Sequence, residues 1–98
     1  MDIFAPLDTG FTVYSKSGCY NCTKVKQLLR DKGSFFLEID CDEFLIEDKE
    51  GFLLFIKERA NKEYRTFPMV FYEGKFIGGF AETQHHFDNL LYFSNDDF

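Results

Sequence analysis

Apolar residues along the chain fall into short continuous runs and into stripes that recur every three to four positions. The runs are rich in β-branched and aromatic residues, as strands are, whereas the stripes are typical of amphipathic helices. Glycine and asparagine separate these segments at several points. The predicted order is strand 11–14, helix 19–32, strand 35–40, a helix from about 42 up to the loop 61–65, strands 68–72 and 75–77, and helix 81–93.

This order, β-α-β-α-β-β-α, predicts an α/β fold with a four-stranded mixed sheet flanked by three or more helices. The first strand–helix–strand unit requires a parallel crossover, and the connection Glu73-Gly74 suits an antiparallel hairpin. Gly33 is expected to end the first helix, Gly51 is a candidate break in the second, and Gly78-Gly79 ends the last strand.

Length, composition and charge limit the number of domains and the kinds of binding partner that this protein can have. The 98 residues, of which 45% are hydrophobic, predict one domain over 1–98, with a loose lead-in at 1–10 and an acidic tail at 94–98. A net charge of −6 argues against nucleic acid as a partner, and no run has the length of a membrane span or the pattern of a signal peptide. We expect a monomer in the reducing cytoplasm.

Candidate chemistry begins with Cys19 and Cys22, three residues apart in the first turn of the first predicted helix. Residues at this spacing share a helix face, so the two sulfurs can form a disulfide or a dithiol. A helix start lowers the pKa of a cysteine, which favours Cys19 as the nucleophile; Cys22, on the apolar stripe, would then resolve the mixed disulfide.

A zinc site is the competing interpretation of the cysteine pair. Zinc needs four ligands, and the remaining candidates are Cys41, His85 and His86, which lack the spacing of a second ligand pair. We therefore predict no metal. Cys41 is expected to be a small apolar residue at a strand end, and the two histidines are expected to lie on the surface of the last helix.

Three other stretches can each be explained by ordinary structural roles when considered one at a time. Thr66-Phe67-Pro68 fits the opening of an edge strand, and Gly78-Gly79 fits either a strand end or a close approach of a ligand to the backbone. The basic residues Lys24, Lys26 and Arg30 are interpreted as a solvated helix face.

In combination these pieces resemble the glutaredoxins of the thioredoxin superfamily, dithiol type, and are similar to short viral and phage members. The resemblance covers residues 11–93 and is carried by Val13-Tyr14-Ser15-Lys16, Cys19-Tyr20-Asn21-Cys22, Arg65-Thr66-Phe67-Pro68 and Phe76-Ile77-Gly78-Gly79-Phe80. It differs from the common family pattern at Tyr20 and Asn21, where Pro, Gly, Ser or Val and then an aromatic residue are usual, and at Phe67, Ala81 and Glu82.

The resemblance implies a thioredoxin-like fold, with glutathione as co-substrate and no permanently bound cofactor. Pro68 would be cis and face the cysteines, while the backbone of Phe67 would bind the cysteinyl part of glutathione. Lys16 and Arg65 would attract its glycine carboxylate. The implied glutathione-binding set is Lys16, Tyr20, Arg65, Thr66, Phe67, Pro68, Gly79, Phe80, Ala81 and Glu82, the last four at the γ-glutamyl end.

These observations favour a glutathione-dependent thiol–disulfide oxidoreductase that reduces protein disulfides or glutathione mixed disulfides. One alternative is a glutathione-independent redoxin, such as an electron donor to ribonucleotide reductase, recharged by a thioredoxin reductase. Another is a module that shares an iron–sulfur cluster between two chains through Cys19 and glutathione. Bulky Tyr20 disfavours the cluster.

Overall fold

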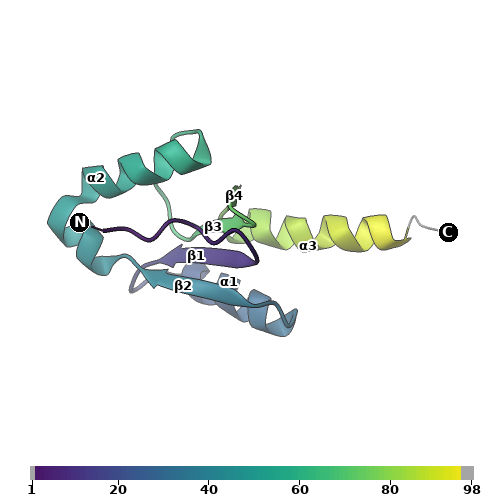
Figure 1. Ribbon diagram of the computed structural model, residues 1–98. Coiled ribbons are helices and arrows are strands. Elements are labelled where there is room, and N and C mark those ends of the chain that lie inside the picture. The colour runs from purple at the N-terminus through teal and green to yellow at the C-terminus, as the bar shows by residue number, and fades with distance from the viewer. Residues whose placement is uncertain (1, 96–98) are drawn as a thin grey trace.

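A four-stranded mixed sheet with strand order β2-β1-β3-β4 forms the centre of the molecule (Figure 1). The computed structural model describes the backbone of residues 2–95 and the side chains of residues 2–89. Strand β1 pairs in parallel with β2 and antiparallel with β3, and β3 pairs antiparallel with β4. The elements are β1 (Phe11–Ser15), α1 (Tyr20–Asp31), β2 (Phe36–Asp40), α2 (Asp42–Ala60), β3 (Met69–Tyr72), β4 (Lys75–Gly78) and α3 (Phe80–Asn95). The predicted fold class and element order are confirmed.

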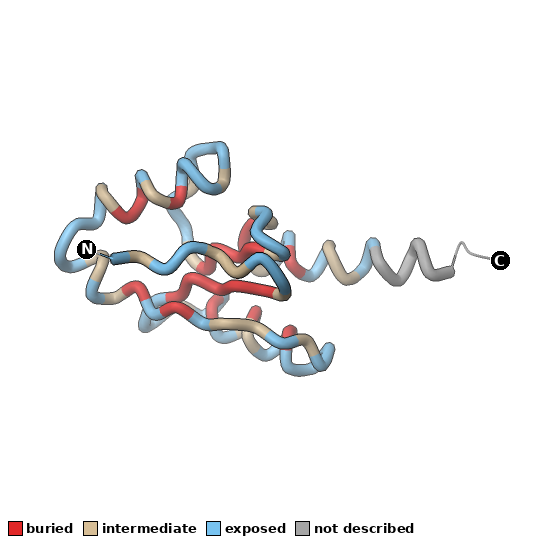
Figure 2. Tube along the Cα trace, viewed as in Figure 1, coloured by how far each residue is buried: buried red, intermediate tan, exposed pale blue. Residues whose placement is uncertain are grey.

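Helices cover both faces of the sheet, with α2 on one face and α1 and α3 on the other (Figure 1). Strand β1 is buried along its whole length, as the red tube in Figure 2 shows, because its side chains alternate between the two cores. Val13 packs with Val25 and Leu29 of α1, whereas Tyr14 packs with Phe52 of α2. Strand β1 thus fixes where both helical layers lie.

Helix α1 begins one residue later than predicted because Cys19 is its N-cap, and it ends at Asp31, one residue before Lys32. The chain then leaves the helix at Gly33, whose φ of +65° is the left-handed conformation expected of a C′ glycine. The buried stripe consists of Cys22, Val25 and Leu29. One cysteine of the pair therefore belongs to the core and the other to the helix cap.

Helix α2 is broken at Asp48 rather than at Gly51, the candidate break in the sequence. Asp48 has non-helical dihedrals (φ −159°, ψ 77°), and its Oδ1 accepts the Gly51 N–H at 3.0 Å, so it caps the second half of the helix. A Cβ at position 51 would collide with that carboxylate. The glycine therefore accommodates a cap placed three residues earlier.

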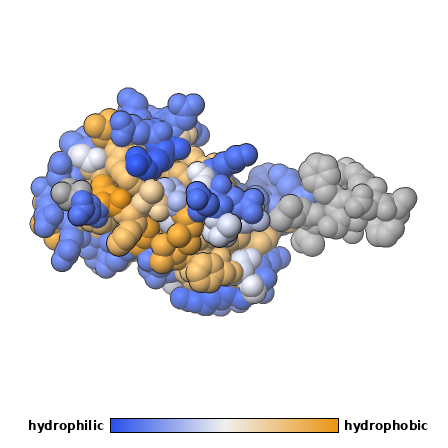
Figure 3. Space-filling view, viewed as in Figure 1, coloured by the Kyte–Doolittle hydropathy of each residue, from blue (hydrophilic) through white to orange (hydrophobic). Residues whose placement is uncertain are grey.

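Residues 2–10 contain no helix or strand but are hydrogen-bonded to β1 and, through the Gly10 carbonyl, which accepts the Glu73 N–H at 2.9 Å, to the turn between β3 and β4. The Tyr14 hydroxyl donates to the Phe4 carbonyl at 2.5 Å, and the Leu7 N–H donates to Thr12 Oγ1 at 3.0 Å. Hydrophobic surface gathers over this segment and β2 (orange in Figure 3). Of the predicted acidic tail, residues 94 and 95 belong to α3, and 96–98 lie outside the described residues.

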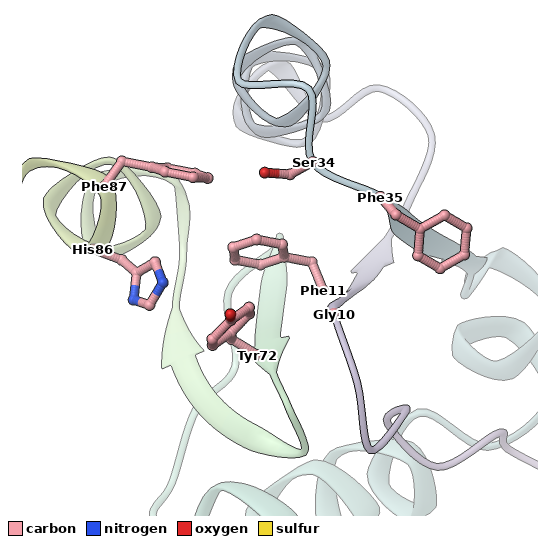
Figure 4. A pocket seen from close by; sticks show the side chains of 7 residues that line it. All are labelled: Gly10, Phe11, Ser34, Phe35, Tyr72, His86 and Phe87. Atoms are coloured by element: carbon pink, nitrogen blue, oxygen red, sulfur yellow. The ribbon is translucent and has the colours of Figure 1, made fainter. Parts of the chain in front are cut away.

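His86 is half-buried, which corrects the prediction that both histidines lie on the surface; His85 is exposed as expected. The His86 ring packs 4.9 Å from the Tyr72 ring and 5.7 Å from those of Phe11 and Phe87 (Figure 4). Its Nε2 is buried and has no hydrogen-bond partner among the described residues. The predicted burial of Leu90 and Leu91 lies outside the described side chains.

No helix in the described part of the chain is long and apolar enough to cross a membrane.

Candidate active site

The loop between β1 and α1 presents the cysteine pair at the carboxyl end of β1. It turns through Gly18, whose φ is +67°, a conformation that glycine adopts without strain. Both the N–H and the hydroxyl of Ser17 donate to the carboxylate of Asp42, the N–H at 2.9 Å. These bonds hold the pKa of Asp42 below its ordinary value, with help from the charge of Lys16. The first residue of α2 thereby anchors the loop.

Cys19 and Cys22 form a disulfide with their Cα atoms 5.2 Å apart. Cys19 Sγ accepts the Cys22 N–H at 3.1 Å and so serves as the helix N-cap. Cys19 is partly exposed, whereas Cys22 is 1% exposed. The unpaired N–H groups at a helix start favour negative charge on the capping atom, so this geometry stabilises a thiolate at Cys19 over one at Cys22.

The segment before β3 carries Phe67 and Pro68, joined by a cis peptide bond as the family resemblance implies. Pro68 is buried and Phe67 is half-buried. The Phe67 ring stacks on Phe52 of α2, with centroids 5.9 Å apart and planes at 10°, and Lys16 Nζ lies 5.9 Å from the Phe67 centroid. Phe67 therefore joins the α2 core to the loop that carries the cysteines.

Gly78 and Gly79 bring the start of α3 against the Pro68 segment. A Cβ on Gly79 would lie 3.0 Å from the Tyr64 hydroxyl and 3.6 Å from the Pro68 carbonyl oxygen. Gly78 has a φ of +136°, and a Cβ there would come within 3 Å of the Glu82 side chain. The sequence left open why the glycine pair is present; the structure shows that Gly78 leaves room for the Glu82 side chain and Gly79 for the Tyr64 hydroxyl.

Glu82 caps the start of α3 with its own side chain. Its Oε1 accepts the Gly79 N–H at 2.7 Å, while the Thr83 N–H and hydroxyl donate to the Gly79 carbonyl at 3.1 and 2.8 Å. A carboxylate at this position also interacts favourably with the positive end of the helix dipole. The carboxylate is exposed and forms no ion pair within the described residues.

Lys24 is a site neighbour that the sequence reasoning missed. Its Nζ lies 4.4 Å from the Phe80 centroid and 5.3 Å from the Tyr20 centroid, and the residue is half-buried rather than fully solvated. The i,i+4 spacing of Tyr20 and Lys24 was the available signal. The contact with Phe80 depends on how α3 packs against α1, which the sequence pattern does not specify.

The remaining predicted glutathione-binding residues are exposed. Arg65 forms ion pairs with two acidic residues: its guanidinium lies 3.2 Å from the Glu50 carboxylate and 4.0 Å from that of Glu63. Lys16 thus lies beside Phe67, and Gly79 lies beside Pro68. Tyr20 and Phe80 both contact Lys24. Arg65 instead forms an ion pair with Glu50. Thr66 and Ala81 lie on the surface of the same segments.

Cys41, the third cysteine, is fully buried at the end of β2. Burial, together with the charges of Asp40 and Asp42, raises the pKa of its thiol to about 12. Its Sγ lies 3.5 Å from the Ile39 carbonyl oxygen, to which the thiol donates. It behaves as the predicted small apolar residue. Among the described residues, no cluster of three or more His, Cys, Asp or Glu could hold a metal ion.

Comparisons with known proteins agree with this geometry. The family model for Glutaredoxin matches residues 11–77. Glutaredoxin 1 of Rickettsia conorii is 36% identical over 84 residues, which is 81% of this chain and 78% of that protein. The hybrid peroxiredoxin hyPrx5 of Haemophilus influenzae is 38% identical over 76 residues, which is 78% of this chain but only 28% of that protein.

Solved structures show the same fold. Glutaredoxin 1 of Francisella tularensis, in complex with cacodylate, superposes with a TM-score of 0.72 at 24% identity, covering 83% of this chain and 94% of that one. The buckwheat glutaredoxin–glutathione complex superposes with a TM-score of 0.65 at 30% identity, covering 81% and 69%. The family match, the fold and the Cys19–Cys22 pair lead to one conclusion: this chain belongs to the glutaredoxin family of thiol–disulfide oxidoreductases.

Proposed function

We propose that the protein uses glutathione to reduce protein disulfides and glutathione mixed disulfides. The observation that carries the proposal is the asymmetry of the cysteine pair: Cys19 caps the helix at the surface and Cys22 is buried one turn below it. The buckwheat relative, solved as a glutathione complex, adds support.

In the reaction we propose, the Cys19 thiolate attacks the sulfur of glutathione in a mixed disulfide. The target thiol leaves as a thiolate and takes a proton from solvent, while a disulfide forms between Cys19 and glutathione. A second glutathione thiolate attacks this disulfide, which releases oxidised glutathione and restores Cys19. With a protein disulfide, Cys22 instead attacks the mixed disulfide on Cys19, and two glutathiones then reduce the Cys19–Cys22 bond.

Glutathione would lie along the contacts described above. The Phe67 backbone, beside the buried Pro68, would pair with its cysteinyl part, and Lys16 would attract its glycine carboxylate. The γ-glutamyl end would lie at the start of α3. The proposed set is Lys16, Tyr20, Arg65, Thr66, Phe67, Pro68, Gly79, Phe80, Ala81 and Glu82, in which Arg65 must leave its ion pair with Glu50 to take part.

Partners and compartment are part of the same proposal. We propose disulfide-containing proteins as targets, with ribonucleotide reductase as one candidate, and a reducing cytoplasm as the setting, where a dithiol needs reduced glutathione to turn over. A monomer suffices, because both cysteines and all proposed contacts lie in one chain.

The decisive experiment traps the intermediate. Cys22→Ser protein incubated with oxidised glutathione should gain one glutathione on Cys19, because the resolving thiol is gone; peptide mass spectrometry locates the adduct. The Cys19→Ser variant is the matched control and should gain none. An adduct on Cys41 would contradict the assignment of Cys19. If oxidised wild-type protein regains its thiols only with a thioredoxin reductase system, glutathione dependence is refuted.

A further inference from the structure

Strand β2 lies at one edge of the sheet, and its outer side has no strand partner among the described residues (Figure 1). Such an edge can accept an extended segment of another chain, which adds to the sheet through main-chain hydrogen bonds. The side chains along an edge strand determine which segments can pair there, because cross-strand neighbours on each face must be compatible.

Side chains of β2 alternate between two faces with different chemistry. Leu37 and Ile39 belong to the apolar core on the face that α2 covers. Glu38 points to the other face, because its carboxylate pairs with Lys26 of α1 at 2.7 Å. Asp40, two residues further along the strand, shares the face of Glu38. A segment added to this edge would therefore meet apolar side chains on one face and carboxylates on the other.

The apolar face of this edge is hollowed. A cavity of about 350 Å³ lies there, between the N-terminal segment, β2 and the start of α2. Phe4, beside this cavity, is 73% exposed, and hydrophobic surface gathers over the same region (Figure 3). The cavity is lined by Phe4, Leu37, Glu38, Ile39, Asp40 and Phe44. Apolar side chains of an added segment would fill this space and cover the Phe4 ring.

Charge is distributed unevenly along the edge. At the start of β2 the Arg30 guanidinium lies 5.5 Å from the Phe36 centroid. At the end of β2 Asp40 is exposed and forms no ion pair with any described residue. The stretch that follows holds four more acids without a described ion pair: Asp42, Glu43, Glu47 and Asp48. The edge thus favours a basic side chain opposite Asp40 and disfavours a second copy of this chain, whose net charge is −6.

The acidic end of this edge adjoins the loop that carries the cysteines. Asp40 is paired in register with Ser15, the last residue of β1. Asp42 accepts hydrogen bonds from both the N–H and the hydroxyl of Ser17, in the loop that leads to Cys19. A segment paired with β2 therefore reaches the active-site loop, where the protein that carries it can present a disulfide.

We propose that β2 docks an extended segment of the protein whose disulfide is reduced, with apolar residues opposite Leu37 and Ile39 and a lysine or arginine opposite Asp40. This inference rests on the proposed reduction of protein disulfides and names the chemistry of the partner. The segment extends the sheet, its apolar side chains are buried beside Phe4, and its basic side chain pairs with the Asp40 carboxylate. The docking surface shares no residue with the proposed glutathione-binding set.

The test uses peptides that carry the same disulfide but different docking segments. Each peptide joins an oxidised Cys-Gly-Gly-Cys end to its segment through a Gly/Ser linker of about fifteen residues, which spans roughly 20 Å. The segment Lys-Val-Thr-Val-Lys presents a lysine to Asp40 whichever way it runs along β2. The matched segments Glu-Val-Thr-Val-Glu and Lys-Ser-Thr-Ser-Lys reverse the charge or remove the apolar side chains. In single turnover at subsaturating concentration, reduced wild-type protein should reduce the first peptide about threefold to fivefold faster than either control.

Variants of the edge show whether the faster reduction depends on β2. Asp40→Asn keeps a side-chain oxygen for the N–H that it binds, and Phe4→Ala keeps its hydrogen-bonded carbonyl, so both should remain folded. Each should lower the difference between the peptides to below about twofold. The matched controls Glu58→Gln and Leu54→Ala remove an exposed acid and an exposed apolar side chain from the second half of α2, and they should leave the difference unchanged.

Equal rates for the three peptides overturn the docking proposal, as does a difference that survives Asp40→Asn and Phe4→Ala or is lost in the control variants. The assay starts from reduced protein and contains no glutathione, so these results leave the glutathione adduct of Cys22→Ser as a separate test. Failure to reduce any of the peptides would refute the proposed reduction of protein disulfides, and the docking proposal with it. A wild-type dimer in size-exclusion chromatography that Phe4→Ala converts to a monomer would make β2 an interface between copies of this chain and also overturn the proposal.

Discussion

Phe52 of α2 connects the stability of the core to the geometry of the active site. Its side chain is fully buried and stacks on Phe44 and on Phe67, with both pairs of centroids 5.9 Å apart. Phe67 is the residue before the cis-proline, and its backbone is the proposed contact of the glutathione cysteinyl group. A change at Phe52 should therefore lower both stability and substrate affinity.

The Phe52→Leu variant keeps an apolar side chain but loses both stacked pairs. Each aromatic pair contributes about 0.5–1.5 kcal/mol beyond area burial, so the loss should be about 1–3 kcal/mol. For a domain of this size each kcal/mol lowers Tm by about 4–8 °C, which gives a fall of roughly 5–20 °C. Total stabilities are typically about 5–15 kcal/mol, so the variant should remain folded at 25 °C.

Phe71→Leu provides the matched control. Phe71 is equally buried and packs against Tyr14 and Phe76, but it has no ring contact with Phe67. Both variants should lose similar stability by thermal or urea denaturation. Only Phe52→Leu should raise KM for a glutathione mixed disulfide at a temperature where both are folded. The rise should be about 1.5-fold to 3.5-fold if roughly half of the Phe52–Phe67 pair energy, about 0.25–0.75 kcal/mol, is lost at the site. Equal KM changes in the two variants would refute the proposed coupling.

Two further predictions follow from buried polar groups. Cys41 should resist iodoacetamide at pH 8 in the native, reduced protein, because burial raises its thiol pKa to about 12 and leaves almost no thiolate, whereas the same peptide should be alkylated after denaturation. Native alkylation of Cys41 faster than that of the surface cysteine would contradict this. The His86→Phe variant should match the wild-type free energy of unfolding or exceed it by about 1 kcal/mol, because it removes a buried Nε2 without a partner from a cluster of aromatic rings. A clear fall in the stability of His86→Phe, measured by thermal denaturation, would contradict this and would mean that Nε2 has a hydrogen-bond partner in solution.

Most of the secondary structure could be predicted from local sequence, because strand propensity and helical periodicity depend on residues that are close together in the chain. The apolar run at 11–14 and the stripe of Cys22, Val25 and Leu29 specified β1 and α1 to within one residue at each end. The break in α2 was misplaced by three residues, at Gly51 instead of Asp48. An aspartate can cap a helix or lie on its surface, and composition alone does not distinguish these roles.

The sequence by itself also determined the redox pair, since residues three apart in a helix turn must share a face. Its surroundings were decided only by tertiary structure. Lys24 was assigned to a solvated face until the packing of α3 on α1 placed Phe80 beneath its ammonium. The family resemblance assigned Arg65 to the glutathione site, and only the tertiary structure shows its ion pair with Glu50 of α2. His86 was expected at the surface because a period-3.6 pattern does not reveal which helix face a sheet will cover. Such contacts join residues far apart in sequence, and they exist only once the sheet order and the helix packing bring those residues together.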